Sequence, residues 1–233
     1  MHDENWSMRT EPNRGKDFTY LTVYPSGYKE NTSYPMIIML HGFGASMYDL
    51  AGLAQVIHDS GYIYVCPNAP IPLQIGPGSL GFAWAVSGGD DAVARSKVDQ
   101  KLEAFWEEAM NSHNVRQGEC LLLGFSQGGG LAYKHGLTRP DMFSGIVALS
   151  CSIRDESVIR DMLPKERDQE IFVAHGLSDN IESARSSVKF LEMEGYHPKY
   201  KEYEMGHEIS QDVLNDLIPW IQGVLPPYRA QET

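Results

Sequence analysis

The feature that most constrains this chain is the pentapeptide Gly-Phe-Ser-Gln-Gly at residues 124–128. Residues 119–123 before it form a short apolar run that is typical of a buried strand, and residues 129–135 after it are expected to form a helix. The order strand, G-x-S-x-G, helix predicts a sharp turn that presents the hydroxyl of Ser126 as a nucleophile. Without the flanking elements, the motif would fit a glycine-rich turn with an incidental serine equally well.

The predicted turn has specific physical requirements. A serine hydroxyl is a weak nucleophile, so it must be held where a base and a substrate can both reach it. We expect a strained backbone at Ser126. The residues at 124 and 128 are glycines because a Cβ at either position would collide with the chain across the turn. The helix that follows brings N–H groups and the positive end of its dipole toward any oxyanion that develops there.

The rest of the chain alternates predicted strands with predicted helices, which indicates an α/β fold with a mostly parallel central sheet and helices on both faces. We expect residues 1–17 to form a loose N-terminal arm and residues 18–233 a single domain. The strands are predicted at residues 18–24, 34–40, 62–66, 119–123, 144–149, 170–174 and 200–203. The helices are predicted at residues 48–60, 91–111, 129–135, 156–163, 182–195 and 209–224.

Composition narrows the possible partners. Hydrophobic residues make up 42% of the chain and charged residues 21%, with a formal net charge of −12. This charge argues against nucleic-acid binding and against docking on anionic lipid. No apolar run is long enough to predict stable membrane insertion, and the polar residues 1–16 predict no secretory signal. Three cysteines in apolar stretches, Cys66, Cys120 and Cys151, are expected to be reduced core thiols of a cytoplasmic protein. The oligomeric state has no signature in the sequence.

A nucleophilic serine needs a base, and the base needs an acid that fixes its tautomer. On this fold the chain order is serine, acid, histidine. His207 lies between the last predicted strand and the last predicted helix and is our candidate base, whereas His175 precedes the acid loop. Asp179 follows the strand at 170–174 and is our candidate acid. Asp155 also follows a strand and is its competitor, although it lies in a polar run.

The tetrahedral oxyanion of acyl transfer requires two N–H donors. The backbone N–H of Gln127, next to the nucleophile, is one by geometry. The other is expected from the glycine-rich loop at residues 41–44, with the amide of Phe43 as the first candidate. Both donors are backbone groups, so this site calls for no metal and no cofactor. The sequence also contains no H-E-x-x-H motif and no paired cysteine spacing that would indicate a metal site.

Residues 67–89 are rich in proline and glycine, which predicts a long irregular loop. Such a loop inside a compact domain is usually a lid or a binding loop. We expect its apolar side chains to form the wall of an acyl pocket; the alternative is a structural loop that buries them beneath itself. The residues concerned are Leu73, Ile75, Leu80, Phe82 and Trp84.

Four motifs occur in a fixed order along the chain: L-H-G-F-G, G-F-S-Q-G-G, H-G-x-x-D and M-G-H. With them, residues 34–225 resemble the phospholipase/carboxylesterase family of α/β-hydrolases, which includes bacterial carboxylesterases and acyl-protein thioesterases. The resemblance implies the α/β-hydrolase fold and cofactor-independent hydrolysis of small-molecule carboxylic esters or thioesters. It also implies the roles given above for Ser126, Asp179, His207, Phe43 and Gln127, and matches Trp84 to a family tryptophan near the pocket.

Two departures from the family pattern concern the substrate. Val86 stands where the family usually has an aspartate, and residues 180–183 read Asn-Ile-Glu-Ser where it usually has two valines and a proline. The first interpretation is an esterase of this family. Because the loop at residues 67–89 is too short to cover a long chain, we expect it to act on short to medium acyl chains. The alternatives are another serine hydrolase of this fold, such as a lipase or peptidase, or a catalytically silent fold used for binding.

Overall fold

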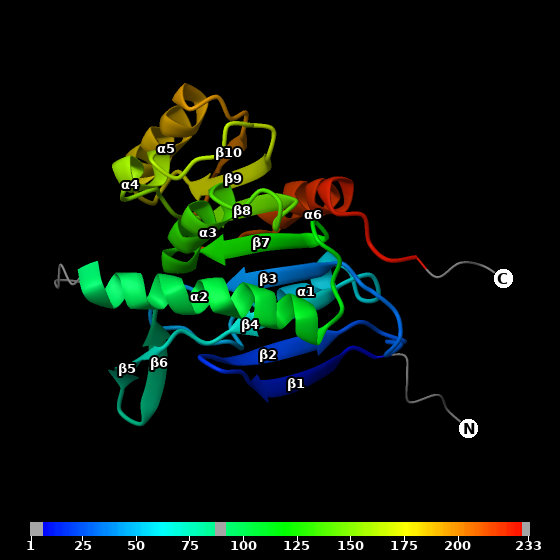
Figure 1. Cartoon of the computed structure of the whole chain (residues 1–233). Coiled ribbons are helices and arrows are strands. Elements are labelled where there is room, and N and C mark those ends of the chain that lie inside the picture. Colours follow the sequence, from blue (N-terminus) through cyan, green and yellow to red (C-terminus); the bar gives the residue numbers. More distant parts are fainter. Residues whose placement is uncertain (1–6, 87–91, 230–233) are drawn as a thin grey trace, which may run out of the picture. The chain divides into compact units, whose positions relative to one another are not determined.

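The computed structural model describes residues 7–86 and 92–229, and its described residues group into two compact units (Figure 1). We call residues 1–116 with 227–233 the N-terminal unit and residues 117–226 the C-terminal unit. Each unit has its own strands and its own buried residues. The prediction of a single domain over residues 18–233 stays a prediction.

The N-terminal unit contains four strands of the central sheet, paired in the order β1–β2–β4–β3. Strands β1 and β2 run antiparallel, as do β2 and β4, whereas β3 and β4 run parallel. A separate two-stranded antiparallel hairpin is formed by β5 and β6 (Figure 1). The elements are β1 (Arg9–Arg14), β2 (Thr19–Tyr24), β3 (Met36–Leu40), α1 (Leu53–Ile57), β4 (Ile63–Pro67), β5 (Ile71–Gly76), β6 (Ser79–Ala83) and α2 (Ala92–Ser112).

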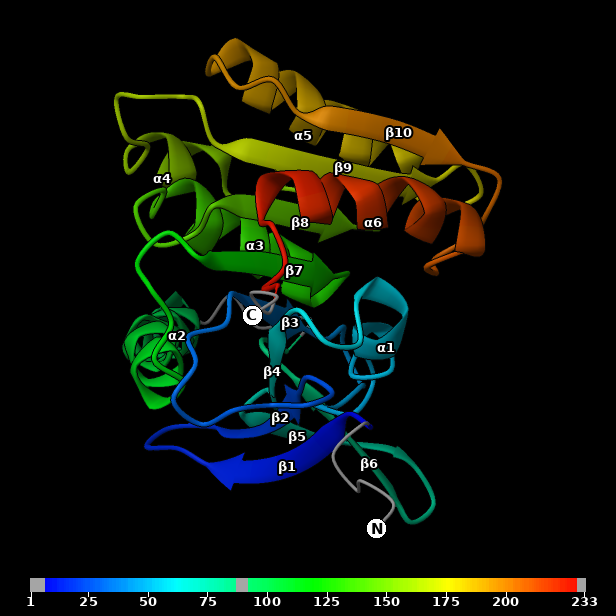
Figure 2. The same cartoon turned by 90° about the vertical axis from the view of Figure 1, so that its right-hand side faces the viewer.

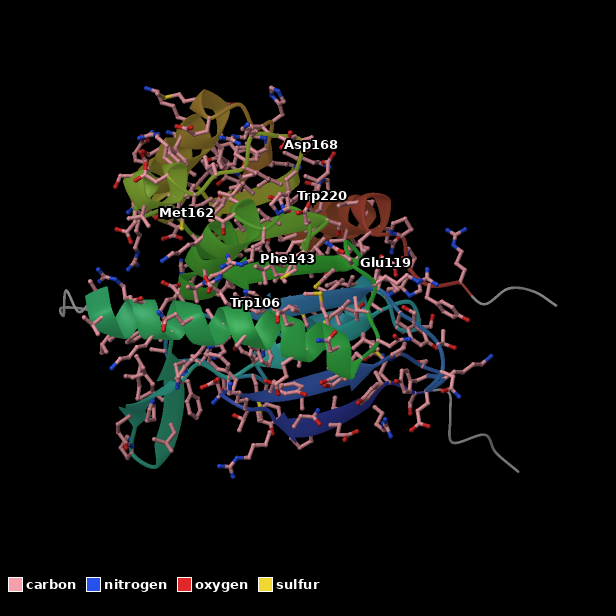
Figure 3. The ribbon with its side chains drawn as sticks, in the orientation of Figure 1. Trp106, Glu119, Phe143, Met162, Asp168 and Trp220 are labelled. Atoms are coloured by element: carbon pink, nitrogen blue, oxygen red, sulfur yellow. The ribbon has the colours of Figure 1, made fainter. Side chains whose placement is uncertain are left out.

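Helix α2 covers this sheet with a stripe of apolar side chains. Phe105, which is buried, packs its ring edge-on against Phe18 and Tyr20, with ring centroids 5.4 and 5.3 Å apart. Trp106, labelled in Figure 3, is fully buried beside it. The stripe recurs at spacings of three and four residues, so its side chains share one face of α2. It consists of Val98, Leu102, Phe105, Trp106 and Ala109.

Two predictions for the N-terminal unit were wrong. Residues 9–14, expected within a loose arm, form β1; residues 1–6 of that arm lie outside the described residues. Pro12 is compatible with this strand because β1 is the edge of the sheet in its unit, where a missing N–H costs no ladder bond. Helix α1 is also much shorter than the predicted helix at 48–60.

The segment expected to be an irregular loop is mostly the β5–β6 hairpin. Pro77 and Gly78 form its two-residue connection, and Gly78 has φ +75°. A proline followed by a glycine with positive φ is typical of a tight turn, so these two residues connect the strands of a regular hairpin. Gly88 and Gly89, which we included in the loop, lie outside the described residues.

The C-terminal unit contains four parallel strands in the order β7–β8–β9–β10. Its first three strands are almost completely buried, as expected for strands covered on both faces. The elements are β7 (Cys120–Phe125), α3 (Gln127–Leu137), β8 (Gly145–Leu149), α4 (Glu156–Arg160), β9 (Glu170–Gly176), α5 (Ile181–Met193), β10 (Lys199–Tyr203) and α6 (Gln211–Val224).

Helices cover both faces of these strands. A Cβ on Gly136 of α3 would meet the side chain of Ile146, and a Cβ on Gly145 would meet Val224 and Trp220 of α6. Because Gly145 and Ile146 are adjacent in β8, they point to opposite faces, so α3 and α6 lie on opposite sides. Figure 2 shows α6 in front of β8 and β9, and Trp220, labelled in Figure 3, packs on Phe172 with ring centroids 5.5 Å apart. The predicted parallel α/β architecture is confirmed.

Within residues 7–86 and 92–229, no helix combines the length and the apolar composition that crossing a bilayer requires.

Candidate active site

Ser126 stands on the turn between β7 and α3. Its backbone has φ 54° and ψ −116°, a region that a residue with a Cβ seldom adopts. A Cβ on Gly124 would collide with the backbone of Gly128 and Gly129 across the turn. The predicted strain and the predicted need for glycine at position 124 are therefore confirmed.

The structure brings Asp179 and His207 to Ser126. Nε2 of His207 lies 2.8 Å from the Oγ of Ser126, and Nδ1 of His207 lies 2.7 Å from Oδ2 of Asp179. A carboxylate can only accept hydrogen bonds, so Nδ1 carries the ring proton and Nε2 is left to accept from the serine hydroxyl. All three side chains lie in the C-terminal unit, at the carboxyl ends of β7, β9 and β10.

The environment keeps Asp179 ionised. Burial acts to raise its pKa, but hydrogen bonds from His207 and from the backbone N–H of Asn180 outweigh burial, and the pKa lies below its ordinary value. A carboxylate that is ionised at neutral pH can orient the imidazole and stabilise its cation. The competitor, Asp155, instead stands at the start of α4, where its side chain makes no capping hydrogen bond.

Two further contacts were not predicted, one at His207 and one at the next residue, Glu208. The ring of Phe125, the last residue of β7, lies 5.1 Å from the imidazole ring, centroid to centroid. The hydroxyl of Ser150 donates to the carbonyl of Glu208 at 3.3 Å, and Ser150 itself has φ 47°. A strained, buried serine that holds the residue after His207 has no sequence motif, so only the fold reveals it.

The predicted oxyanion loop at residues 41–44 is fixed by hydrogen bonds inside the N-terminal unit. The amide of Ala69 donates to Nε2 of the buried His41 at 3.0 Å, so Nδ1 carries the proton and donates to the carbonyl of Gly42 at 2.8 Å. Burial lowers the pKa of His41, which keeps the ring neutral. The indole of Trp84 donates to the carbonyl of His41 at 2.9 Å.

The β5–β6 hairpin is attached to the same loop. The amide of Gly44 donates to the carbonyl of Phe82 at 2.9 Å, and the amide of Phe82 donates to the carbonyl of Ala45 at 2.8 Å. Phe43 between them exposes 51% of its surface. Among the described residues, its amide N–H has no hydrogen-bond partner. The hairpin thus fixes the loop without taking up the amide N–H of Phe43, the predicted oxyanion donor.

The five predicted pocket residues fall into three environments. Ile75 and Leu80, near the hairpin tip, expose 55% and 63% of their surfaces, while Leu73 and Phe82 are half-buried. Trp84 is only 2% exposed and packs on Phe18 and His41. The contacts of Trp84 therefore support the oxyanion loop, and its part in an acyl pocket stays a prediction.

The cysteines are buried free thiols, as predicted. Burial raises the pKa of Cys66 to about 12 and raises those of Cys120 and Cys151 as well. Cys151 fills the space over Gly129, where a Cβ would collide with its sulfur. Within the described ranges, no group of three or more His, Cys, Asp or Glu side chains could hold a metal ion.

Exchange of Gly81 for alanine is expected to destabilise the protein by about 1–3 kcal/mol, because the new Cβ would collide with the backbone of Gly44. Thermal unfolding would then begin earlier, by about 2–4 °C per kcal/mol. Gly52→Ala is the control: Gly52 has φ −62° and open space around it, so the change should stay within about 0.5 kcal/mol. Equal unfolding temperatures for the two variants would contradict the packing of the hairpin on the loop.

Comparison with known proteins identifies the family. The sequence pattern of the Phospholipase/Carboxylesterase family matches residues 27–225. Acyl-protein thioesterase 1 of Mycosarcoma maydis is 26% identical, over 88% of this chain and 97% of that protein. Among solved structures, esterase PE8 gives a TM-score of 0.74 at 22% identity over 88% of this chain and 97% of its own. The carboxylesterase from Mesorhizobium loti gives 0.73 at 18% identity, over 92% and 99%. This chain belongs to the Phospholipase/Carboxylesterase family of α/β-hydrolases.

Proposed function

We propose that this protein is a serine carboxylesterase that works through an acyl-enzyme. The observation that carries the proposal is the hydrogen-bond chain from Ser126 through His207 to Asp179, with atom separations of 2.8 and 2.7 Å. The strained turn at Ser126 supports the same assignment, because backbone strain of this kind is concentrated at functional sites.

In the first half-reaction, the Oγ of Ser126 attacks the acyl carbon while Nε2 of His207 takes the hydroxyl proton. The tetrahedral intermediate collapses, the bond to the alcohol breaks, and His207 returns the proton to the leaving oxygen. In the second half-reaction, water gives a proton to His207 and attacks the acyl carbon. The bond from the acyl carbon to Oγ then breaks, His207 returns the proton to Oγ, and the acid leaves with Ser126 restored. Asp179 keeps its charge throughout and stabilises the imidazolium.

The oxyanion is stabilised by the amides of Gln127 and Phe43. The amide of Phe43 has no partner among the described residues, and the β5–β6 hairpin and Trp84 hold the loop that carries it. Loss of one such donor costs about 3 kcal/mol of transition-state stabilisation. Because both donors are backbone groups, side-chain exchanges at these two positions are a poor test of them.

The substrates are small-molecule esters with short to medium acyl chains, and thioesters are the second class to test because curated relatives carry the name acyl-protein thioesterase. The acyl pocket includes side chains of the β5–β6 hairpin. The protein acts in the cytoplasm, without a cofactor and without stable membrane insertion.

A fluorophosphonate probe and a panel of p-nitrophenyl esters from acetate to palmitate, with one acyl thioester, test this function. The expected result is covalent labelling at Ser126 and a specificity constant that rises and then stops rising within the medium chain lengths. A protein that is not labelled would be a silent binding fold. A maximum at the longest acyl chains would indicate a lipase, and cleavage of peptide amides with inert esters would indicate a peptidase.

Exchange of Leu73 for alanine is expected to alter the acyl-length profile. Each methylene that enters an apolar pocket contributes about 0.8 kcal/mol, or roughly a fourfold change in specificity constant. The variant should therefore change activity on hexanoate relative to acetate by about that factor or more. Val56→Ala, at an exposed position of α1, is the matched control. If Leu73→Ala lowers the unfolding temperature but leaves the profile unchanged, the hairpin serves only as scaffold.

A further inference from the structure

A second histidine lies against the acid of the candidate triad. His175, in β9, is 2% exposed, and its Nε2 lies 3.2 Å from Oδ2 of Asp179. Oδ2 of Asp179 is the same oxygen that Nδ1 of His207 approaches at 2.7 Å. The two imidazoles therefore converge on one carboxylate oxygen.

Neither ring nitrogen of His175 makes a hydrogen bond within the part of the chain that the structure describes. Buried polar groups are nearly always hydrogen-bonded, so an unpaired imidazole in a strand needs a reason. A residue that served packing alone would be apolar at this position, like the other buried residues of β9 from Ile171 to Ala174. The histidine is thus explained better by its neighbour Asp179 than by the core.

A second carboxylate, that of Glu202, lies near His175, but other residues already bind it. Glu202 faces His175 from β10, where the two residues are register partners. Its carboxylate is already engaged by the guanidinium of Arg185 from α5 and by the hydroxyl of Tyr200, at 2.8–2.9 Å. Burial lowers the pKa of His175 and the nearby His207 lowers it further, whereas Asp179 and Glu202 act to raise it. Burial is the largest effect, so the ring is neutral at neutral pH.

We propose that His175 is a positioning residue, a neutral imidazole whose Nε2–H is directed at Oδ2 of Asp179. Hydrogen bonds at active sites are often poorly aligned without substrate and tighten in the reacting complex. A small rotation of either side chain would turn the 3.2 Å contact into a hydrogen bond. His175 then holds Asp179 in line with His207 and limits how strongly the carboxylate attracts the proton on Nδ1 of His207.

The proposed role predicts the direction in which the pH dependence of kcat/KM changes when the N–H of His175 is removed. If the N–H of His175 is removed, the carboxylate of Asp179 becomes a stronger acceptor and stabilises the imidazolium form of His207. More alkaline conditions are then needed to make His207 neutral and able to accept the serine proton. The acidic limb of the kcat/KM profile should therefore move to higher pH, an effect that loss of packing alone would not produce.

The test compares His175→Phe, which keeps a ring but removes the donor, with His175→Gln, whose amide N–H can reach the same oxygen. For His175→Phe we expect a fall in kcat/KM of about tenfold, because misplacement of a catalytic group by about 1 Å can cost as much as ~100-fold. We also expect the acidic limb to rise by several tenths of a pH unit. For His175→Gln we expect kcat/KM within about threefold of the wild-type value and an acidic limb within about 0.2 pH units of it. His135→Phe, at a buried histidine of α3, is the control for lost packing and should leave the limb in place.

The role would be overturned if His175→Phe and His175→Gln lost kcat/KM equally and the acidic limb of the pH profile did not move. Full activity of His175→Phe would also overturn it. The inference rests on the proposed function, and one measurement separates the two. Long-range ¹H–¹⁵N spectra of the wild-type histidine rings at pH 7 should show the Nε2–H tautomer for His175, whether or not esters are cleaved. A protonated ring, or the Nδ1–H tautomer, would overturn the contact with Asp179 itself.

Discussion

Exchange of Ser126 for alanine is expected to lower kcat on a short-chain p-nitrophenyl ester by at least about 10⁴-fold. The triad acts as a unit, so removal of the nucleophile removes almost all of its contribution. The residual rate over water would come from the oxyanion donors and substrate binding. Steady-state turnover with titrated active sites measures the loss, and the fluorophosphonate probe should no longer label the variant.

The same variant should fold at least as well as the wild type. Alanine keeps the Cβ, so the strained backbone at φ 54° is unchanged, and only the hydrogen bond to His207 is lost. Functional sites often cost stability, so the unfolding temperature should be equal or slightly higher. Ser157→Ala, at an exposed position of α4, is the matched control and should keep full turnover. More than a tenth of wild-type turnover in Ser126→Ala would remove Ser126 from the role of nucleophile.

Exchange of Asp179 for asparagine is expected to lower kcat by about 10³–10⁴-fold with the fold retained. An amide can donate to Nδ1 of His207 as well as accept from it, so it permits the tautomer that leaves Nε2 unable to accept the serine proton. Asp155→Asn is the matched control, because it removes the same charge from the same unit at the start of α4. The reverse ranking of the two variants would assign the acid role to Asp155.

The pH dependence of the free energy of unfolding provides a second test of the interaction between Asp179 and His207. The pKa of Asp179 is depressed in the folded protein, so its ionised form contributes stability above the ordinary pKa of an aspartate, about 3.9. This contribution is lost as the pH falls through the lower, folded-state pKa. Asp179→Asn should therefore be less stable than the wild type at pH 7, and the difference should shrink toward pH 2. A difference that grows on acidification would contradict the depressed pKa.

The sequence contained the local parts of the candidate site. The turn around Ser126 could be predicted because its glycines and its flanking strand and helix are contiguous. Asp179 and His207 could be predicted because each follows a strand, and parallel strands bring their carboxyl ends to one edge. These signals need no knowledge of which segments pair.

The parts that escaped prediction depend on distant partners. Residues 9–14 carry polar and charged side chains, and they form a strand only because β2 offers its backbone as a partner. The hairpin escaped prediction because its prolines and glycines indicated a long irregular loop, whereas Pro77 and Gly78 form a single tight turn between two strands. Ser150 acts through Glu208, far along the chain, so no local pattern distinguishes it from an ordinary core residue. His175 belongs to the motif H-G-x-x-D, but only the fold shows that its ring lies against the carboxylate of Asp179.

The attachment of the β5–β6 hairpin separates two tasks that many enzymes combine in one loop. Its base, at Gly81 and Phe82, is bonded to Gly44 and Ala45 and admits little variation. Its tip, from Ile75 to Leu80, is exposed and makes none of these bonds. Under the proposed function, exchanges at the tip should therefore change the preferred acyl group, while the base keeps the backbone around the amide of Phe43 in place. Substrate range would then diversify by changes at the tip alone, with the catalytic residues unchanged.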